Sequence, residues 1–294
     1  MNETVEPQAR HSSSCPICEG EQLAALFEVQ AWARYEMVQC STCEAVFSSP
    51  RPTSEELNTF YTSEYFKRSD NDGHGYSDYR SMAEANARRM WHQLKEYAPL
   101  GEVAPKRVLD VGCATGGFLA EAKKDGWECV GVELSQYAVD VARSEFGIDA
   151  LQGDAFLPAL EENTFGLVTM WHVLEHLIDP IATLQRARDL LTPGGLLFVE
   201  LPNWDSFGRV VKGSGWKQIK PPEHINYLSP RSLRVAAERA SLEVIRCDTH
   251  YPSLMDKAAV RRISQPFHAG VALVAAAVCK FGHGGYARLL ARKA

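Results

Sequence analysis

The sequence has no excess of positive charge, no long apolar run and no internal repeat. Its 31 lysines and arginines against 37 acidic residues give a formal net charge of −6. There is thus no strong nucleic-acid signal, because phosphate contacts need a basic face. The longest apolar run, residues 269–279, is well short of the roughly 20 residues of a membrane-spanning helix. The N-terminus also lacks the basic and apolar regions of a secretory signal. We therefore expect a cytoplasmic protein with no transmembrane segment; the sequence leaves its oligomeric state open.

The eight cysteines are then expected to be reduced thiols or metal ligands rather than disulfides. Two C-x₂-C pairs lie near the N-terminus and consist of Cys15, Cys18, Cys40 and Cys43. Two such knuckles supply four thiolates to one tetrahedral zinc ion, and a four-cysteine site has no open position for catalysis. We predict a structural Zn²⁺ in a small ribbon with short strands near residues 23–29 and 35–39. The paired spacing argues against a redox C-x-x-C motif.

A domain boundary is predicted at the proline-rich segment 49–52, because proline removes an amide donor and resists helix. A helix is expected at 82–97, where apolar residues are spaced to face a core. The expected parts are a disordered tail at 1–14, the zinc ribbon at 15–52, a helical linker or lid at 53–100, and a core at 101–294 with an insertion at 252–284.

Residues 107–119 are the stretch around which the core is organised. A short apolar run with β-branched valines passes through three glycines into an amphipathic segment, which predicts a strand, a tight turn and a helix. Glycines suit such a turn because a Cβ blocks positive φ angles or the close approach of a ligand. Amides at the start of a helix can receive a polar or anionic group.

Two acidic residues follow at the tips of the next two predicted strands. Glu133 ends the second strand, where a carboxylate suits the two hydroxyls of a ribose. Asp154 lies just past the third strand, where it can accept a hydrogen bond from an adenine amino group. Together they indicate an adenosine-containing cofactor. The turn lacks the full G-x-G-x-x-G spacing, which disfavours a dinucleotide.

Strands and helices are predicted to alternate through the rest of the core. Such alternation predicts an α/β fold with a parallel sheet and helices on both faces. Strands are expected near residues 107–111, 128–133, 148–152, 166–171, 195–201, 242–248 and 286–292, and helices near 117–126, 136–146, 180–191 and 230–240.

The run 110–116, Glu133, Asp154 and the run 191–199 resemble, in this order, the motifs of class I S-adenosylmethionine-dependent methyltransferases. The resemblance implies a Rossmann-like seven-stranded sheet whose last strand is antiparallel, with S-adenosylmethionine as cofactor. Ala114 stands where many members have a glycine. Members with N-terminal zinc ribbons occur in sugar and natural-product pathways. The implied cofactor site consists of Asp110, Gly112, Cys113, Ala114, Gly116, Glu133, Leu134, Asp154, Ala155 and Trp171.

The catalytic candidates follow the fourth and fifth core strands and are His172, Glu175, His176 and His224. The first three are spaced to share one face of a helical turn, and His224 lies in a loop that crosses the same edge of the sheet. One interpretation makes His224 or His172 a general base for an acceptor hydroxyl. A second makes all four a divalent-metal site. A third makes Glu175 and His176 a structural pair.

The metal interpretation has an analogue in the resemblance. Ubiquinone-pathway O-methyltransferases and small-RNA 2′-O-methyltransferases have an E-x-x-E-H motif after this strand and a later histidine, and here His172 replaces the first glutamate. The sequence thus predicts methyl transfer from S-adenosylmethionine to a small-molecule or glycan acceptor, with O-methylation preferred. The alternative is an RNA or protein methyltransferase whose zinc ribbon recognises the macromolecule. The intact cofactor motifs disfavour a third reading, a non-catalytic docking module.

Overall fold

A computed structural model of the chain describes residues 12–31, 33–53, 56–57, 79–251 and 277–294. Most of the predicted tail, much of the predicted lid and most of the predicted insertion lie outside the described residues. Helix α3 (Tyr79–Tyr97) begins earlier than predicted, and the side chains of its first turns are not described.

The main sheet has seven strands in the order β10-β11-β8-β7-β4-β5-β6. Neighbouring strands from β8 to β6 pair in parallel, whereas β11 pairs antiparallel to both β8 and β10. The predicted fold class is therefore confirmed, including the antiparallel last strand. The strands are β4 (Arg107–Val111), β5 (Glu128–Glu133), β6 (Asp149–Gln152), β7 (Phe165–Trp171), β8 (Leu191–Pro202), β10 (Glu243–His250) and β11 (Tyr286–Arg292).

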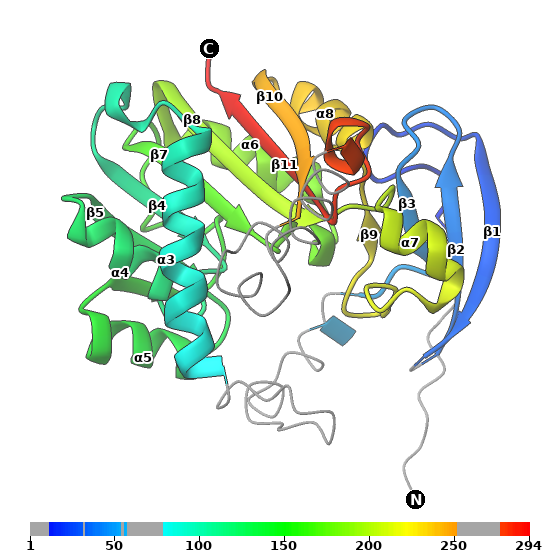
Figure 1. Cartoon of the computed structure of the whole chain (residues 1–294), viewed down its shortest axis with the longest axis horizontal. Helices are drawn as coiled ribbons and strands as arrows, with labels where there is room; N and C mark the ends of the chain where they lie inside the picture. Colours follow the sequence, from blue (N-terminus) through cyan, green and yellow to red (C-terminus); the bar gives the residue numbers. More distant parts are fainter. Residues whose placement is uncertain (1–11, 32, 54–55, 58–78, 252–276) are drawn as a thin grey trace, which may run out of the picture.

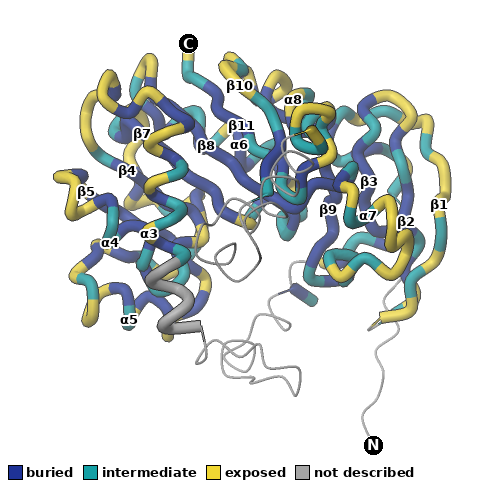
Figure 2. The backbone as a smooth tube through the Cα atoms, viewed as in Figure 1, coloured by how far each residue is buried: buried dark blue, intermediate teal, exposed yellow. Residues whose placement is uncertain are grey.

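Helices cover both faces of this sheet (Figure 1). One apolar cluster joins α3, α4 (Gly117–Lys124) and α5 (Gln136–Phe146) to one face. A second cluster joins α6 (Pro180–Leu190) and α8 (Pro230–Arg239) to the other. The central strand β7 is buried at every residue, as its largely apolar sequence predicts for a parallel strand covered on both faces. The tube in Figure 2 shows this buried centre.

The ribbon forms a separate four-stranded sheet in the order β1-β2-β3-β9. Strands β1 (Leu23–Gln30) and β2 (Arg34–Cys40) match the two predicted short strands, and β3 (Val46–Ser49) was not predicted. The fourth strand, β9 (Asn226–Tyr227), comes from the core and pairs antiparallel with β3. The core thus contributes a strand to the ribbon sheet, which lies at one end of the molecule (Figure 1).

Several short helical segments lie between the main elements. They are η1 (Leu100–Glu102), η2 (Leu174–His176), α7 (Phe207–Lys212) and η3 (Gly213–Gly215). The turn η2 follows the central strand β7, and α7 follows β8. Both therefore lie at the carboxyl edge of the sheet, where open α/β sheets bind their ligands.

Candidate active site

The glycine-rich turn between β4 and α4 has left-handed backbone at three residues. The φ angles are 74° at Gly112, 48° at Ala114 and 81° at Gly116. A Cβ on Gly112 would lie 2.7 Å from the Val173 side chain, and one on Gly116 would lie 2.9 Å from Ala142. Both glycines are therefore required by close packing as well as by φ. Ala114 adopts a conformation that costs a residue with a Cβ some strain, which is common at ligand sites.

Glu133 organises this turn from the tip of β5. Its carboxylate accepts hydrogen bonds from the amides of Ala114 at 3.1 Å and Ser135 at 3.0 Å. Burial raises the pKa of Glu133, and these amides act against that rise. Asp110, one residue before the end of β4, is 3% exposed and accepts from the Thr169 hydroxyl at 2.6 Å. Burial raises the pKa of Asp110 to about 7.

The other predicted cofactor residues surround this turn at different depths. The amide of Gly153 donates to the Glu133 carbonyl at 2.9 Å, which places Asp154 in the next turn along the edge. Asp154 itself accepts from the Phe156 amide at 2.9 Å. Leu134 is 52% exposed, whereas Cys113, Ala155 and Trp171 are buried. The structure therefore brings the turn and Glu133 into direct contact, with Asp154 beside them.

The four N-terminal cysteines converge on one point. Their sulfur atoms all lie within 4.8 Å of one another, with the Cys15–Cys43 and Cys18–Cys40 pairs at 3.5 Å. A Cβ on Gly20 would lie 3.2 Å and 3.3 Å from the sulfurs of Cys18 and Cys40, so the backbone there approaches the thiols closely. This donor set and its closed geometry fit a tetrahedral zinc ion.

The catalytic candidates are placed differently from the predicted helical turn. The turn η2 spans only residues 174–176, and His172 precedes it with a φ of 56°. The amide of His172 donates to the Glu200 carbonyl at 2.8 Å. Among the described residues, Glu175, His176 and His224 have ligand atoms within 4.8 Å of one another. His172, the fourth predicted member of the site, is not part of that group.

Glu175 is the buried centre of this group. Its side chain is 2% exposed, and neither carboxylate oxygen has a hydrogen-bond partner in the described part of the chain. His172 Nδ1 lies 3.3 Å from Glu175 Oε1, and His176 Nε2 lies 4.0 Å from the same oxygen. Burial alone raises the pKa of Glu175, but the contact with His172 and the charges of His176 and His224 outweigh it and hold the pKa at about 2.

The two imidazoles beside Glu175 are held by the backbone and by each other. His176 Nδ1 lies 2.7 Å from the Glu223 carbonyl, which can only accept, so Nδ1 donates and a neutral ring carries its lone pair on Nε2. The His224 ring packs edge-on at 4.7 Å from the His176 ring. His224 is 4% exposed. Burial and the neighbouring His176 lower its pKa well below the usual value.

A second polar cluster at the same edge was missed by sequence reasoning. Buried Glu200 lies 3.7 Å from His172 Nε2 and 3.2 Å from His250 Nε2. The Tyr286 ring packs against both imidazoles, at 5.1 Å and 5.9 Å. Burial raises the pKa of Glu200 to about 7 and lowers that of His250 to about 3. The available signal was a glutamate in the apolar run of β8 and a histidine at the end of β10.

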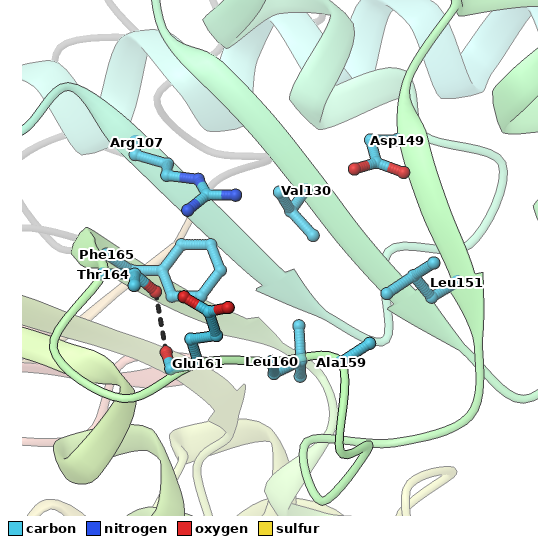
Figure 3. A pocket seen from close by; sticks show the side chains of 9 residues that line it. All are labelled: Arg107, Val130, Asp149, Leu151, Ala159, Leu160, Glu161, Thr164 and Phe165. Carbon is cyan, nitrogen blue, oxygen red and sulfur yellow. Dashed lines mark hydrogen bonds between the residues drawn. The ribbon is translucent and has the colours of Figure 1, made fainter.

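A cavity of about 160 Å³ lies at the opposite end of the sheet. Figure 3 shows its lining, including Arg107, Asp149 and Phe165, which stand at the starts of β4, β6 and β7. The Arg107 guanidinium lies 5.0 Å from the centre of the Phe165 ring. Because the glycine-rich turn is at the carboxyl ends of the strands, this cavity is separate from the candidate active site.

The fold, the turn and the acidic strand tips together define a class I S-adenosylmethionine-dependent methyltransferase. A family model described as a methyltransferase domain matches residues 82–246, more than half of the chain, and the protein belongs to this family. Among the residues that the structure describes, no helix has the length and apolar character needed to span a bilayer.

Named relatives agree with this assignment. The chain is 29% identical over 186 residues to a ubiquinone biosynthesis O-methyltransferase of Azoarcus sp. (strain BH72), covering 54% of this chain and 79% of that protein. It is 30% identical over 198 residues to the protein of the same name from Histophilus somni (strain 2336), covering 61% and 82%. A solved SAM-dependent methyltransferase of Thermotoga maritima, described as a possible histamine N-methyltransferase, shares the fold with a TM-score of 0.56 at 21% identity, covering 79% and 99%.

Proposed function

We propose that this enzyme methylates a hydroxyl of a small-molecule or glycan acceptor, with a divalent cation held by Glu175, His176 and His224. The observation that carries the proposal is the convergence of these three side chains at the carboxyl edge of the sheet. The relatives named as O-methyltransferases support an oxygen acceptor. The acidic composition supports a small acceptor over the RNA alternative.

In this proposal the cofactor lies over the glycine-rich turn, with Glu133 at the ribose and Asp154 at the adenine. Glu133 already accepts two amide hydrogen bonds, but a carboxylate has about four lone-pair sites and retains room for two hydroxyls. The cofactor supplies a methyl group activated by its sulfonium. The protein's part is to hold the acceptor oxygen close to that methyl group and in line with it.

The two imidazoles and one carboxylate of the group fit a divalent transition-metal cation. Glu175 offers a buried carboxylate whose oxygens have no hydrogen-bond partner in the described residues; His172 Nδ1 lies 3.3 Å from Oε1. Burial of a carboxylate is costly unless positive charge compensates for it, and a cation adds such charge. The contact of His176 Nδ1 with the Glu223 carbonyl orients the ring, as a hydrogen bond to the other ring nitrogen does in metal-binding histidines. A bound divalent ion supplies a positive charge that orients an acceptor oxygen and lowers its pKa.

A general-base mechanism is the second candidate, and His224 and His172 are the two histidines considered as the base. His224 has a lowered pKa and is therefore neutral near pH 7, as a base must be. His172 is the more accessible imidazole, with 41% of its side chain exposed. Burial alone lowers the pKa of His172, but the contact with Glu175 and the charge of Glu200 outweigh it, so its net shift is upward. This difference favours His224 as the base.

We also propose that the four cysteines hold one structural zinc ion, for which the reducing cytoplasm is the suitable compartment.

The proposed methyl transfer is tested by incubating the full chain with methyl-labelled S-adenosylmethionine and a cell extract, then separating small molecules, RNA and protein. Label in the small-molecule fraction supports the proposal. Label retained by RNA or protein, and lost after nuclease or protease treatment, would establish the macromolecular alternative.

A further inference from the structure

The zinc ribbon is connected directly to the backbone that carries Glu175, His176 and His224. Strand β9 begins two residues after His224 and is the fourth strand of the ribbon sheet. We propose that Arg51 and Asn226 are positioning residues, which join the ribbon to the η2 turn and set the geometry of the candidate metal group. The inference rests on the proposed function for what that group does, but its contacts are independent of any ligand.

Asn226 holds the backbone on both sides of Glu175 and His176. Its Nδ2 donates to the carbonyls of Leu174 at 3.0 Å and Leu177 at 2.7 Å. Its Oδ1 accepts from Arg51 at 2.9 Å. Since the carbonyls can only accept and the guanidinium can only donate, the orientation of this amide is fixed. Asn226 is 1% exposed, so loss of either set of contacts leaves buried polar groups without partners.

Arg51 reaches the same turn from the ribbon side. Its Nη2 donates to the Leu177 carbonyl at 3.1 Å and the Ile178 carbonyl at 2.8 Å. Burial lowers the pKa of Arg51 to about 10, which still leaves it cationic at neutral pH. A planar guanidinium can satisfy an amide oxygen and two carbonyls at once, and an ammonium group on a flexible stem does so less well. Arg51 therefore fixes the end of the η2 turn relative to β9.

The backbone makes a parallel connection through Ile225. The Ser48 amide of β3 donates to the Ile225 carbonyl at 3.1 Å, and the Ile225 amide donates to the Glu175 carbonyl at 2.9 Å. On the other flank, the Tyr227 hydroxyl donates to the His224 carbonyl at 2.7 Å. Two hydrogen bonds thus separate the ribbon sheet from the residue at the centre of the group. A shift of β3 will therefore change the positions of Glu175 and His224 together.

The alternative is that Arg51 only attaches the ribbon to the core. Arg239 is a matched control for this alternative. Arg239 of α8 donates to the Cys18 carbonyl at 3.0 Å and pairs with Glu19 at 2.7 Å. It links the ribbon to the core as Arg51 does, but in the described part of the chain these contacts lie away from the η2 turn and His224. If Arg51 only docks the ribbon, the two arginines should be equivalent in their effects on the group.

The test uses the full-length, zinc-loaded protein with Mn²⁺ as the probe, measured by electron paramagnetic resonance. We expect Arg51→Ala to lower Mn²⁺ affinity by about tenfold or more, as is usual for residues that orient metal ligands. Affinity for S-adenosylmethionine should change by less than about twofold, and zinc content should stay constant. Arg51→Lys should recover part of the Mn²⁺ affinity, and Arg239→Ala should behave as wild type.

Hydrogen exchange supplies a readout that needs no bound metal. Arg51→Ala and Asn226→Asp should both speed exchange in peptides covering residues 172–178 and 222–227, because the Ile225 amide bonds to Glu175. If Arg51→Ala leaves both readouts unchanged, or if Arg239→Ala reproduces its effects, the positioning role is wrong. If wild-type protein binds no Mn²⁺, the metal assignment fails, and the exchange comparison alone then decides whether Arg51 positions the turn.

Discussion

The carboxylate of Glu133 accepts a 3.1 Å hydrogen bond from the amide of Ala114, so the tip of β5 holds the glycine-rich turn that follows β4. This contact joins the two predicted cofactor motifs directly. The same carboxylate also caps the amide of Ser135 at the start of α5. A residue with this position and these contacts is expected to control cofactor affinity more than global stability.

We predict that Glu133→Ala lowers affinity for S-adenosylmethionine by about 10–150-fold. The estimate corresponds to loss of a charge-assisted hydrogen bond of roughly 1.5–3 kcal/mol. Calorimetric titration measures the change. Glu128→Ala is the control, because Glu128 lies at the other end of β5 and pairs with Arg107 near the surface. Equal affinities for wild type and Glu133→Ala would remove Glu133 from the cofactor site.

The ribbon is predicted to bind one zinc ion per chain. Cys40→Ser should lower zinc content and the stability of the ribbon, because metal binding and folding are coupled in such small sites. Cys247→Ser is the control, since Cys247 lies outside the four-cysteine cluster. Elemental analysis of protein purified without chelator gives the zinc content. Protein that contains no zinc under those conditions would contradict the assignment.

Buried Glu200 is predicted to make stability depend on pH. Its folded-state pKa of about 7 lies above its ordinary value of 4.5. Between these values the folded protein keeps a proton that the unfolded chain has released, so stability falls as pH rises through this window. Glu200→Gln should therefore gain stability relative to wild type from pH 4.5 to 7, by up to roughly 3 kcal/mol.

Denaturant unfolding at several pH values measures this difference. His250 has a lowered pKa and contributes the opposite trend at acid pH, but it is present in both proteins and largely cancels in the comparison. A constant difference in unfolding free energy across the window would show that Glu200 ionises normally in the folded protein.

His224 separates the metal mechanism from the base mechanism. We predict that His224→Ala lowers methyl transfer by about 10²-fold while cofactor affinity is unchanged. If the group binds a metal, activity should be lost to a chelator and restored by a divalent ion, with zinc content followed as a control for the ribbon. If the chelator leaves activity unchanged but His224→Ala still lowers it, the base mechanism is favoured.

The base mechanism also has a specific pH signature. A histidine base with an ordinary pKa gives a rate that rises through pH 6–7. Burial lowers the pKa of His224 well below that range. A His224 base should therefore already be neutral at pH 6, and the rate should show no rise attributable to it between pH 6 and 7.

The parts of the fold that the sequence predicted are those with local signals. The turn at Gly112–Gly116 is marked by glycines that both φ and packing require, and β7 is marked by a largely apolar run. Strand β9 is two residues long and finds its partner far along the chain, because Asn226 and Tyr227 pair with Phe47 and Val46 of β3. Hydrophobic periodicity in the sequence does not predict a pairing between such distant residues.

The arrangement of the candidate site differs from the one that the sequence predicted, and the catalytic role of its residues stays a prediction. His172, Glu175, His176 and His224 all lie at the expected edge. With its left-handed backbone, His172 places its ring between Glu175, 3.3 Å from Nδ1, and Glu200, 3.7 Å from Nε2, so it contacts the candidate metal group without being one of its three members. The proximity of Glu200 and His250 depends on β11 inserting between β8 and β10. That strand order is a property of the topology, which single-residue patterns do not contain.

The atom that receives the methyl group is the most direct test of the proposed function. Product formed from S-adenosylmethionine with a ¹³C-labelled methyl group can be isolated from the small-molecule fraction and examined by carbon NMR. We predict a single labelled methoxy resonance for the wild-type product. This resonance should disappear with Glu175→Gln while cofactor binding persists. A labelled methyl bonded to nitrogen or carbon, or an undiminished methoxy signal from Glu175→Gln, would contradict it.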